Sequence, residues 1–262
     1  MNDFFGKLSF MKNKLFFGSG NAKLSEYIST FSLPAGWTCP SANECLCKSN
    51  RQTGILKDGP ELKFRCFAAS QEALFTTVRN ARWNNLESLK AAKTVQGMAD
   101  LIHNSLPMGV SKVRIHVSGD FFSETYFKAW LNVAAANPAV VFYGYTKQLQ
   151  FMVKYRDVMP ANFRLVASKG GMQDKLIGNY KLVSAEVVFS TEEARRKGLE
   201  IDHDDSHAIA ATKSFALLLH GTQPKDTVAG DAWAVIKRLI GGYNAKKKNM
   251  LRTAKPIELV VA

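Results

Sequence analysis

The sequence lacks any run of 18 apolar residues, although 46% of its 262 residues are hydrophobic. A helix needs about 20 consecutive apolar residues to cross a bilayer, so an ordinary membrane-spanning helix is excluded. The first 20 residues mix phenylalanine and lysine and lack the continuous apolar core of a secretory signal. These absences predict a cytoplasmic protein without membrane contact.

Neither the Gly-x-Gly-x-x-Gly pattern nor the phosphate-loop pattern occurs, which argues against a nucleotide-binding sheet. What the second half does contain is an alternation of strand-like and helical segments. The strand-like runs lie at residues 113–118, 140–145, 163–168, 184–190 and 214–219. One helical pattern follows Ser123, and another follows Thr146 and ends at Pro160. This alternation predicts an α/β fold with a mostly parallel sheet, as a partial or closed (β/α) barrel or as an open doubly wound sheet.

Polar residues come directly after three of the predicted strands. Ser118 and Asp120 follow the first, Thr146 and Lys147 the second, and Ser168 the third. Barrel enzymes carry their chemistry at the carboxyl ends of the strands, so these five residues are predicted to line a cofactor-binding pocket. Asp120 is the candidate catalytic residue, because a carboxylate there can bind a hydroxyl or a cation or act as a base. Alternatively, Ser118 and Asp120 only cap the turn into the next helix.

No cysteine follows residue 66, and the four cysteines of the chain, Cys39, Cys45, Cys47 and Cys66, fall within one short segment. Disulfides do not persist in a reducing compartment, so the cluster favours a metal-binding loop over residues 39–66. Four thiolates complete either an iron–sulfur cluster or a zinc site. The Cys-x-Cys pair favours a four-iron, four-sulfur cluster, with zinc as the alternative and four unrelated buried thiols as the remaining interpretation.

Acidic residues are absent from Ala232 to Ile257, where seven lysines and arginines lie, and the whole chain carries a formal net charge of +13. A basic run suits the phosphate backbone of nucleic acids, although it is also typical of a solvated surface. We therefore predict one α/β barrel-like domain over residues 1–240 and a basic C-terminal tail, residues 241–262, that contacts nucleic acid.

Three further polar groups have two interpretations each. Tyr143 and Tyr145 could stack on a ring or serve as ordinary strand residues. His116 lies on a predicted strand and is expected to be structural. The acids and histidines of residues 202–207 resemble a metal site. Successive positions on a loop cannot all converge, so a solvated loop is expected there.

Several motifs, in one order along the chain, resemble the gene-product-eighty-eight family of bacteriophage proteins. They are Phe31 to Pro40, Cys66 to Ala68, His116 to Phe121, Tyr143 to Lys147, His220 to Lys225, and Gly242 with Tyr243. The cysteine loop before a βα series is similar to the layout of radical S-adenosylmethionine enzymes. This resemblance implies an iron–sulfur cluster at the mouth of a barrel.

The cysteine spacing departs from those enzymes, which use Cys-x-x-x-Cys-x-x-Cys and leave one iron open for S-adenosylmethionine. Here the gaps are five, one and eighteen residues, and a fourth cysteine is present. The predicted function is therefore a phage-encoded iron–sulfur protein whose cluster sits on all four cysteines. The alternatives are a radical enzyme that uses S-adenosylmethionine, and a zinc-stapled nucleic-acid-binding protein.

Overall fold

The computed structural model describes residues 14–20, 24 and 28–240. Its strands are β1 (Phe17–Ser19), β2 (Ile28–Ser32), β3 (Cys47–Ser49), β4 (Leu56–Asp58), β5 (Lys112–Ser118), β6 (Val141–Thr146), β7 (Phe163–Ser168), β8 (Ser184–Val188) and β9 (Phe215–Leu218). Its helices are α2 (Phe67–Leu74), α3 (Thr76–Ala92), α4 (Val95–Ser105), α5 (Glu124–Ala136), α6 (Leu149–Tyr155), η2 (Arg156–Val158), α7 (Lys175–Asn179), α8 (Thr191–Arg196), α9 (Ser206–Ala210) and α10 (Val228–Ile240).

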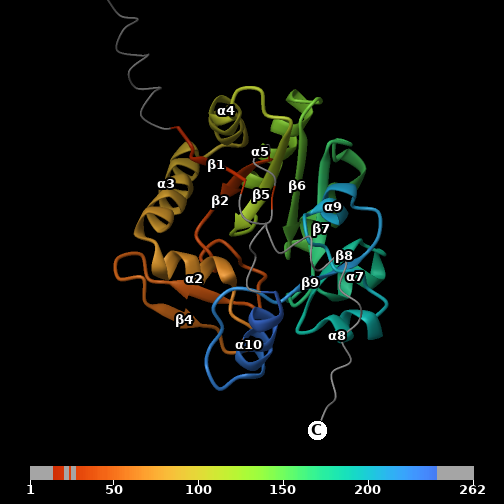
Figure 1. The fold of residues 1–262 in the computed structure, drawn as a ribbon. Coiled ribbons are helices and arrows are strands. Elements are labelled where there is room, and N and C mark those ends of the chain that lie inside the picture. The colour runs from red at the N-terminus through yellow and green to blue at the C-terminus, as the bar shows by residue number, and fades with distance from the viewer. Residues whose placement is uncertain (1–13, 21–23, 25–27, 241–262) are drawn as a thin grey trace, which may run out of the picture.

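A seven-stranded sheet with the order β1-β2-β5-β6-β7-β8-β9 forms the centre of the fold (Figure 1). Within this sheet, β2, β5, β6, β7, β8 and β9 run parallel to one another. The strand β1 pairs with β2 in the antiparallel direction. The predicted α/β fold with a mostly parallel sheet is confirmed. The closed barrel is wrong, because closure needs the two outer strands to pair and β1 and β9 do not pair within the described residues.

The five predicted strands are confirmed as β5 to β9, with ends that differ by at most two residues. The predicted helix after Ser123 is α5, and the Ser123 hydroxyl accepts a hydrogen bond from the Tyr126 amide at 3.2 Å. These strands are rich in apolar and β-branched residues, which is why this half of the sequence is easy to interpret.

The first half holds the elements that the sequence pattern does not reveal. The segment from Cys39 to Cys66 was expected to lack regular structure, but it contains the two-stranded sheet of β3 and β4. These strands have only three residues each, too few for a period to show. The helix α2 begins directly after its N-cap Cys66, and Ser70 and Glu72 lie buried within it.

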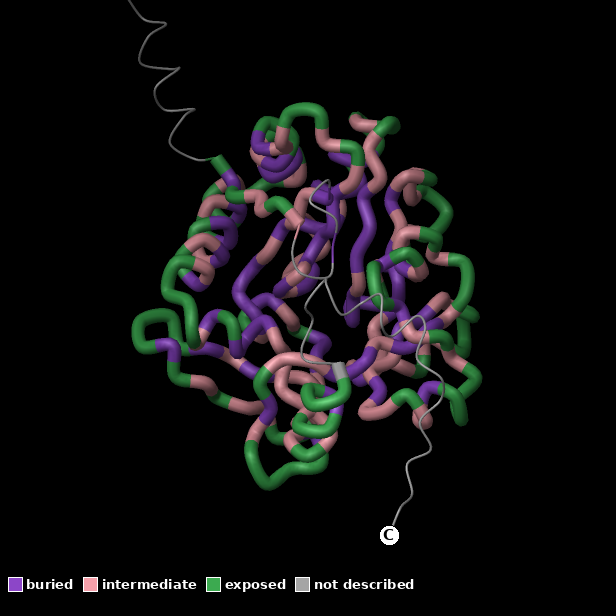
Figure 2. Tube along the Cα trace, in the orientation of Figure 1, coloured by how far each residue is buried: buried purple, intermediate pink, exposed green. Residues whose placement is uncertain are grey.

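Apolar side chains cover the sheet on both faces. On one face, α3, α4, α5 and α6 pack on the outward residues of β5, β6 and β7 around Trp130 and Phe127. On the other face, α9 packs through Ala208 near Tyr143 and Phe215. The central strands are accordingly buried along most of their length, while the exposed residues gather on the connecting loops (Figure 2). Among the described helices, none combines the length and apolar character that a bilayer crossing requires.

Candidate functional site

A cavity of about 340 Å³ lies at the carboxyl ends of the central parallel strands. Its polar wall holds the five residues predicted from the strand ends: Ser118, Asp120, Thr146, Lys147 and Ser168. Its apolar wall holds Phe64, Phe67, Val187, Leu217 and Leu219. The fold thus brings all five predicted residues to one place, and their use in binding a ligand stays a prediction.

Asp120 joins the ends of β5 and β6. Its Oδ1 accepts hydrogen bonds from the Thr146 hydroxyl at 2.6 Å and the Phe121 amide at 2.8 Å, and its Oδ2 accepts one from the Lys147 amide at 2.8 Å. A carboxylate offers about four acceptor positions, so one remains for a donor in the cavity. Burial raises the pKa of Asp120, and the three hydrogen bonds oppose that rise.

Lys147 is a buried cation that is held by neutral oxygens. Its Nζ donates to the Ser168 carbonyl at 3.1 Å, to the Ser168 hydroxyl at 3.0 Å and to the Lys169 carbonyl. The ammonium group has three donors, and all three are therefore engaged. Lys147 stabilises the turn after β7 and gives the cavity wall a fixed positive charge.

The four cysteines do not form the predicted ligand set. Cys39, Cys45 and Cys66 line the cavity, whereas Cys47 is buried beside Asp58 in a small apolar cluster. Burial raises the pKa of the Cys39 and Cys66 thiols, and it raises the pKa of Cys45 to about 11. At neutral pH these thiols are therefore protonated.

The metal centre predicted from the cysteine spacing is a wrong prediction. In the described part of the chain, no group of three or more His, Cys, Asp or Glu side chains is arranged to hold a metal ion. All four cysteines are free thiols. The iron–sulfur cluster, the zinc alternative and the S-adenosylmethionine enzyme all need that ligand set, so all three predictions are wrong.

His116 lies where β5 breaks its regular pairing. The register between β2 and β5 shifts in this region, and His116 adopts a left-handed conformation with φ of 58°. This turns its ring into the helix-covered core, where Nε2 lies 3.0 Å from the Tyr126 hydroxyl and the ring packs on Phe121. The expected structural role is consistent with this position. Burial lowers the pKa of His116 to about 3.

The neutral, buried His116 should make stability fall with pH below about 6.5. Its pKa is lower in the folded chain than its ordinary value of 6.5, so between pH 6.5 and 3 the unfolded chain takes up the proton more readily. Stability is then lost as pH falls, by up to about 1.4 kcal/mol per pH unit. Urea unfolding at pH 7 and pH 4.5 measures this loss. His116→Asn, which tolerates a left-handed backbone and does not titrate there, should show a smaller loss; an equal loss would contradict the prediction.

The segment of residues 202–207 is not the solvated loop expected from the sequence. Asp202 and Asp205 are fully buried, and Asp205 forms an ion pair with Arg114 of β5. The hydroxyls of Tyr143 and Tyr145 each donate to the Asp205 carboxylate at 3.3 Å. The tyrosines thus hold a carboxylate, and Tyr145 also lines the cavity. The acid-rich sequence of this segment gives no signal that two of its carboxylates are buried.

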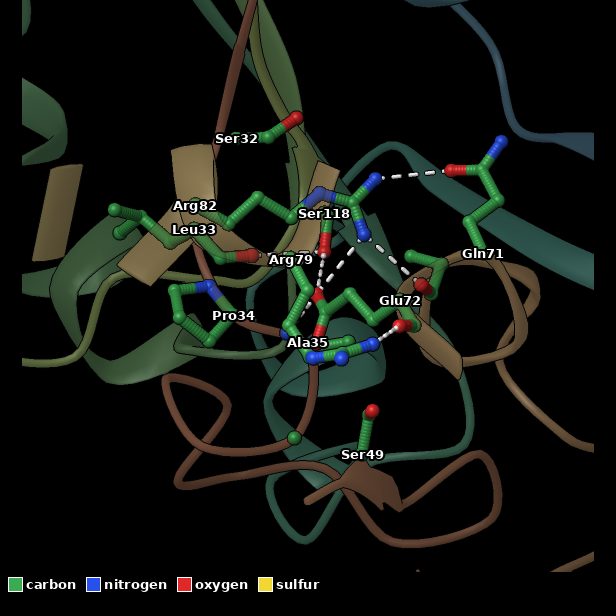
Figure 3. A network of polar contacts seen from close by, with 12 residues as sticks. Ser32, Leu33, Pro34, Ala35, Ser49, Gln71, Glu72, Arg79, Arg82 and Ser118 are labelled. Atoms are coloured by element: carbon green, nitrogen blue, oxygen red, sulfur yellow. Dashed lines mark hydrogen bonds and ion pairs between the residues drawn. The ribbon is translucent and has the colours of Figure 1, made fainter. Parts of the chain in front are cut away.

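Glu72 is a second buried acid that the sequence does not reveal. It is fully buried in α2 and accepts hydrogen bonds from Arg82 at 2.9 Å, the Ala35 amide at 2.8 Å and the Ser118 hydroxyl at 3.3 Å (Figure 3). Burial raises its pKa, and the Arg82 charge opposes the rise. This network joins α2, α3 and the end of β5, and so fixes one side of the cavity.

The basic tail, residues 241–262, lies outside the described residues. Nucleic-acid contact through it therefore stays a prediction, as does the location of the protein in the host cytoplasm.

Comparisons with known proteins support the resemblance noted in the sequence. A family model described as Gene product 88 matches residues 7–238. The Gene 88 protein of Mycobacterium phage L5 is 28% identical over 138 residues, which cover 49% of this chain and 51% of that relative. The match thus spans about half the length of the curated relative. No solved structure matches. The chain therefore belongs to the Gene product 88 family, and the relative named above is a bacteriophage protein.

Proposed function

We propose that this protein binds a small organic ligand in the cavity at the carboxyl ends of β5, β6 and β7. The observation that supports this proposal is the cavity itself, whose volume of about 340 Å³ falls within the usual range of ligand pockets. Ligand pockets in parallel sheets lie at this end of the strands.

The lining of the cavity offers both apolar and polar contacts to such a ligand. Phe67, Leu217 and Leu219 offer apolar contact. The remaining acceptor position of Asp120 can take a hydroxyl or amino hydrogen from the ligand. Apolar surface supplies most of the affinity in such sites, and a few placed polar groups fix the orientation of the ligand.

We further infer that the sheet is an open, partial form of a (β/α) barrel. From β5 to β9 the strands stand side by side in their chain order, without the reversal that marks a doubly wound sheet. The connecting helices α5, α6 and α7 all pack on the same apolar core. This topology supports a concave inner face on which the cavity lies.

A neutral fluorescent probe tests the proposed site. N-phenyl-1-naphthylamine should bind saturably at one site per chain, since the apolar wall can accept its rings. Leu217→Trp fills the cavity and should weaken binding at least about tenfold, which corresponds to about 1.4 kcal/mol. Fluorescence titration measures both affinities, and circular dichroism checks the fold. Val158→Trp, at a residue that is 67% exposed and does not line the cavity, is the matched control. Equal affinities for both variants would refute the proposal.

A further inference from the structure

We propose that the ligand of this cavity carries an oxyanion, a carboxylate or a phosphate group, and that Arg114 binds it. This inference rests on the proposed function, because it names the chemical class of ligand for the same cavity. It depends on the geometry of Arg114, which neither the family nor the strand-end pattern assigns to ligand binding.

Arg114 lines the cavity from the middle of the sheet and is only 9% exposed. Its Nη1 donates to Asp205, and its guanidinium lies over the Tyr145 ring, with the central carbon 4.9 Å from the ring centroid. Its Nε is buried and has no hydrogen-bond partner in the described part of the chain. A buried donor without a partner costs free energy, and an oxyanion in the cavity would satisfy it.

The Asp205 carboxylate does not use up the binding capacity of Arg114. Nη1 of Arg114 shares that carboxylate with the hydroxyls of Tyr143 and Tyr145. A guanidinium has five donor hydrogens in a planar fork, and this fork matches the two oxygens of a carboxylate or phosphate. The ion pair and the tyrosine ring therefore hold the guanidinium in place before the ligand arrives.

The other two basic side chains with a fixed charge on the cavity wall already donate to oxygens of the chain, and their buried donors are not without partners among the described residues. Lys147 donates all three ammonium hydrogens to oxygens after β7. Arg65 donates through Nε, at 2.9 Å, and through Nη2 to the two oxygens of Asp58. Arg114 is thus the cavity cation whose buried Nε lacks a partner among the described residues.

Two probes with the same rings test this assignment. 8-Anilinonaphthalene-1-sulfonate carries an oxyanion, and N-phenyl-1-naphthylamine lacks it. Wild-type protein should bind the sulfonate roughly ten- to hundredfold more tightly, the range expected for one charge-assisted hydrogen-bonded pair. The double variant Arg114→Met with Asp205→Asn removes both charges together, and asparagine suits the left-handed backbone of residue 205. We expect it to bind the two probes equally.

Two single variants separate hydrogen bonding from the general positive field. Arg114→Lys keeps the charge but lacks the Nε donor, so it should lose most of the preference even if the double variant fails to fold. Arg164→Met is the matched control. Arg114 of β5 and Arg164 of β7 both pair with Tyr143 of β6, but Arg164 does not line the cavity. It removes one positive charge and should keep the preference.

The outcomes separate this inference from the proposed function. If the neutral probe binds and Leu217→Trp weakens it, but the sulfonate gains nothing over it, the cavity binds ligands and the oxyanion assignment is wrong. A preference that is lost in Arg164→Met and kept in Arg114→Lys would also overturn it, since the preference would then follow net charge. If neither probe binds the wild-type protein, the proposed function and this inference both fail.

Discussion

Replacing Glu72 with alanine should lower the free energy of unfolding by about 3–5 kcal/mol, the usual cost of removing one partner from a buried ion pair. Glu72 is fully buried, and Arg82 beside it is 5% exposed. Without the carboxylate, the Arg82 guanidinium stays buried with only the Ala68 carbonyl and the Gln71 side chain as partners. The Ala35 amide and the Ser118 hydroxyl also lose an acceptor. Urea unfolding at pH 7 measures the change.

Two controls show whether the loss comes from the stranded charge. Glu72→Met with Arg82→Met removes both charges and should recover much of the stability, because apolar residues of similar size can replace a buried pair. Glu87→Ala breaks the exposed pair between Glu87 and Arg51 and should cost less than about 1 kcal/mol. If Glu72→Ala costs no more than Glu87→Ala, the network of Figure 3 does not stabilise the fold as argued.

The strands and the strand-end residues could be predicted from the sequence because both follow from local rules. A strand buried on both faces is rich in apolar residues, and β5 to β9 are, although Arg114 and His116 interrupt β5, Arg164 interrupts β7 and Glu186 interrupts β8. The residue that follows a parallel strand lies at the carboxyl edge of the sheet, whichever position that strand has among its neighbours in the sheet. That rule alone placed Asp120 and Lys147 on the wall of one cavity.

The partners of buried charges could not be predicted in this way. Glu72 and Arg82 are ten residues apart on different helices, and Arg114 and Asp205 are 91 residues apart. Nothing in the local composition distinguishes the buried Asp202 and Asp205 from the exposed Asp204. The burial of Asp205 follows from the packing of α9 on the sheet, which is a long-range property.

The cysteines show the opposite error. Their local spacing predicted a four-cysteine metal site that the described part of the fold does not form. Spacing along a loop limits how far apart thiols lie but does not set the direction of each side chain. Cys47 belongs to β3 and packs in the cluster of Ala35, Ala68 and Ala69, so it does not line the cavity that the other three line. The sequence did not reveal the short strand that places Cys47 there.

Gly119→Ala is expected to have the second large effect, a loss of about 2–5 kcal/mol in the free energy of unfolding. Gly119 has φ of 86°, and a left-handed conformation costs a residue with a side chain about 1–2 kcal/mol. An added Cβ would also lie 2.5 Å from the Thr38 hydroxyl oxygen and 2.7 Å from the Leu33 Cβ. Such overpacking costs about 1–3 kcal/mol more.

The clash cannot be relieved cheaply, because both neighbours are anchored. The Thr38 hydroxyl donates to the Pro34 carbonyl at 2.8 Å, and the Leu33 amide donates to the Ser118 carbonyl at 2.9 Å.

Gly109→Ala is the matched control, since Gly109 has φ of 72° but no atom within 4 Å of the added Cβ. Urea unfolding of both variants should show a clearly larger loss for Gly119→Ala. Since Gly119 lines the cavity, the displaced loop should also weaken binding of the neutral probe, whereas Gly109→Ala should leave that affinity unchanged. Equal stability losses in the two variants would show that the loop yields, and that the wall of the cavity is less rigid than its contacts imply.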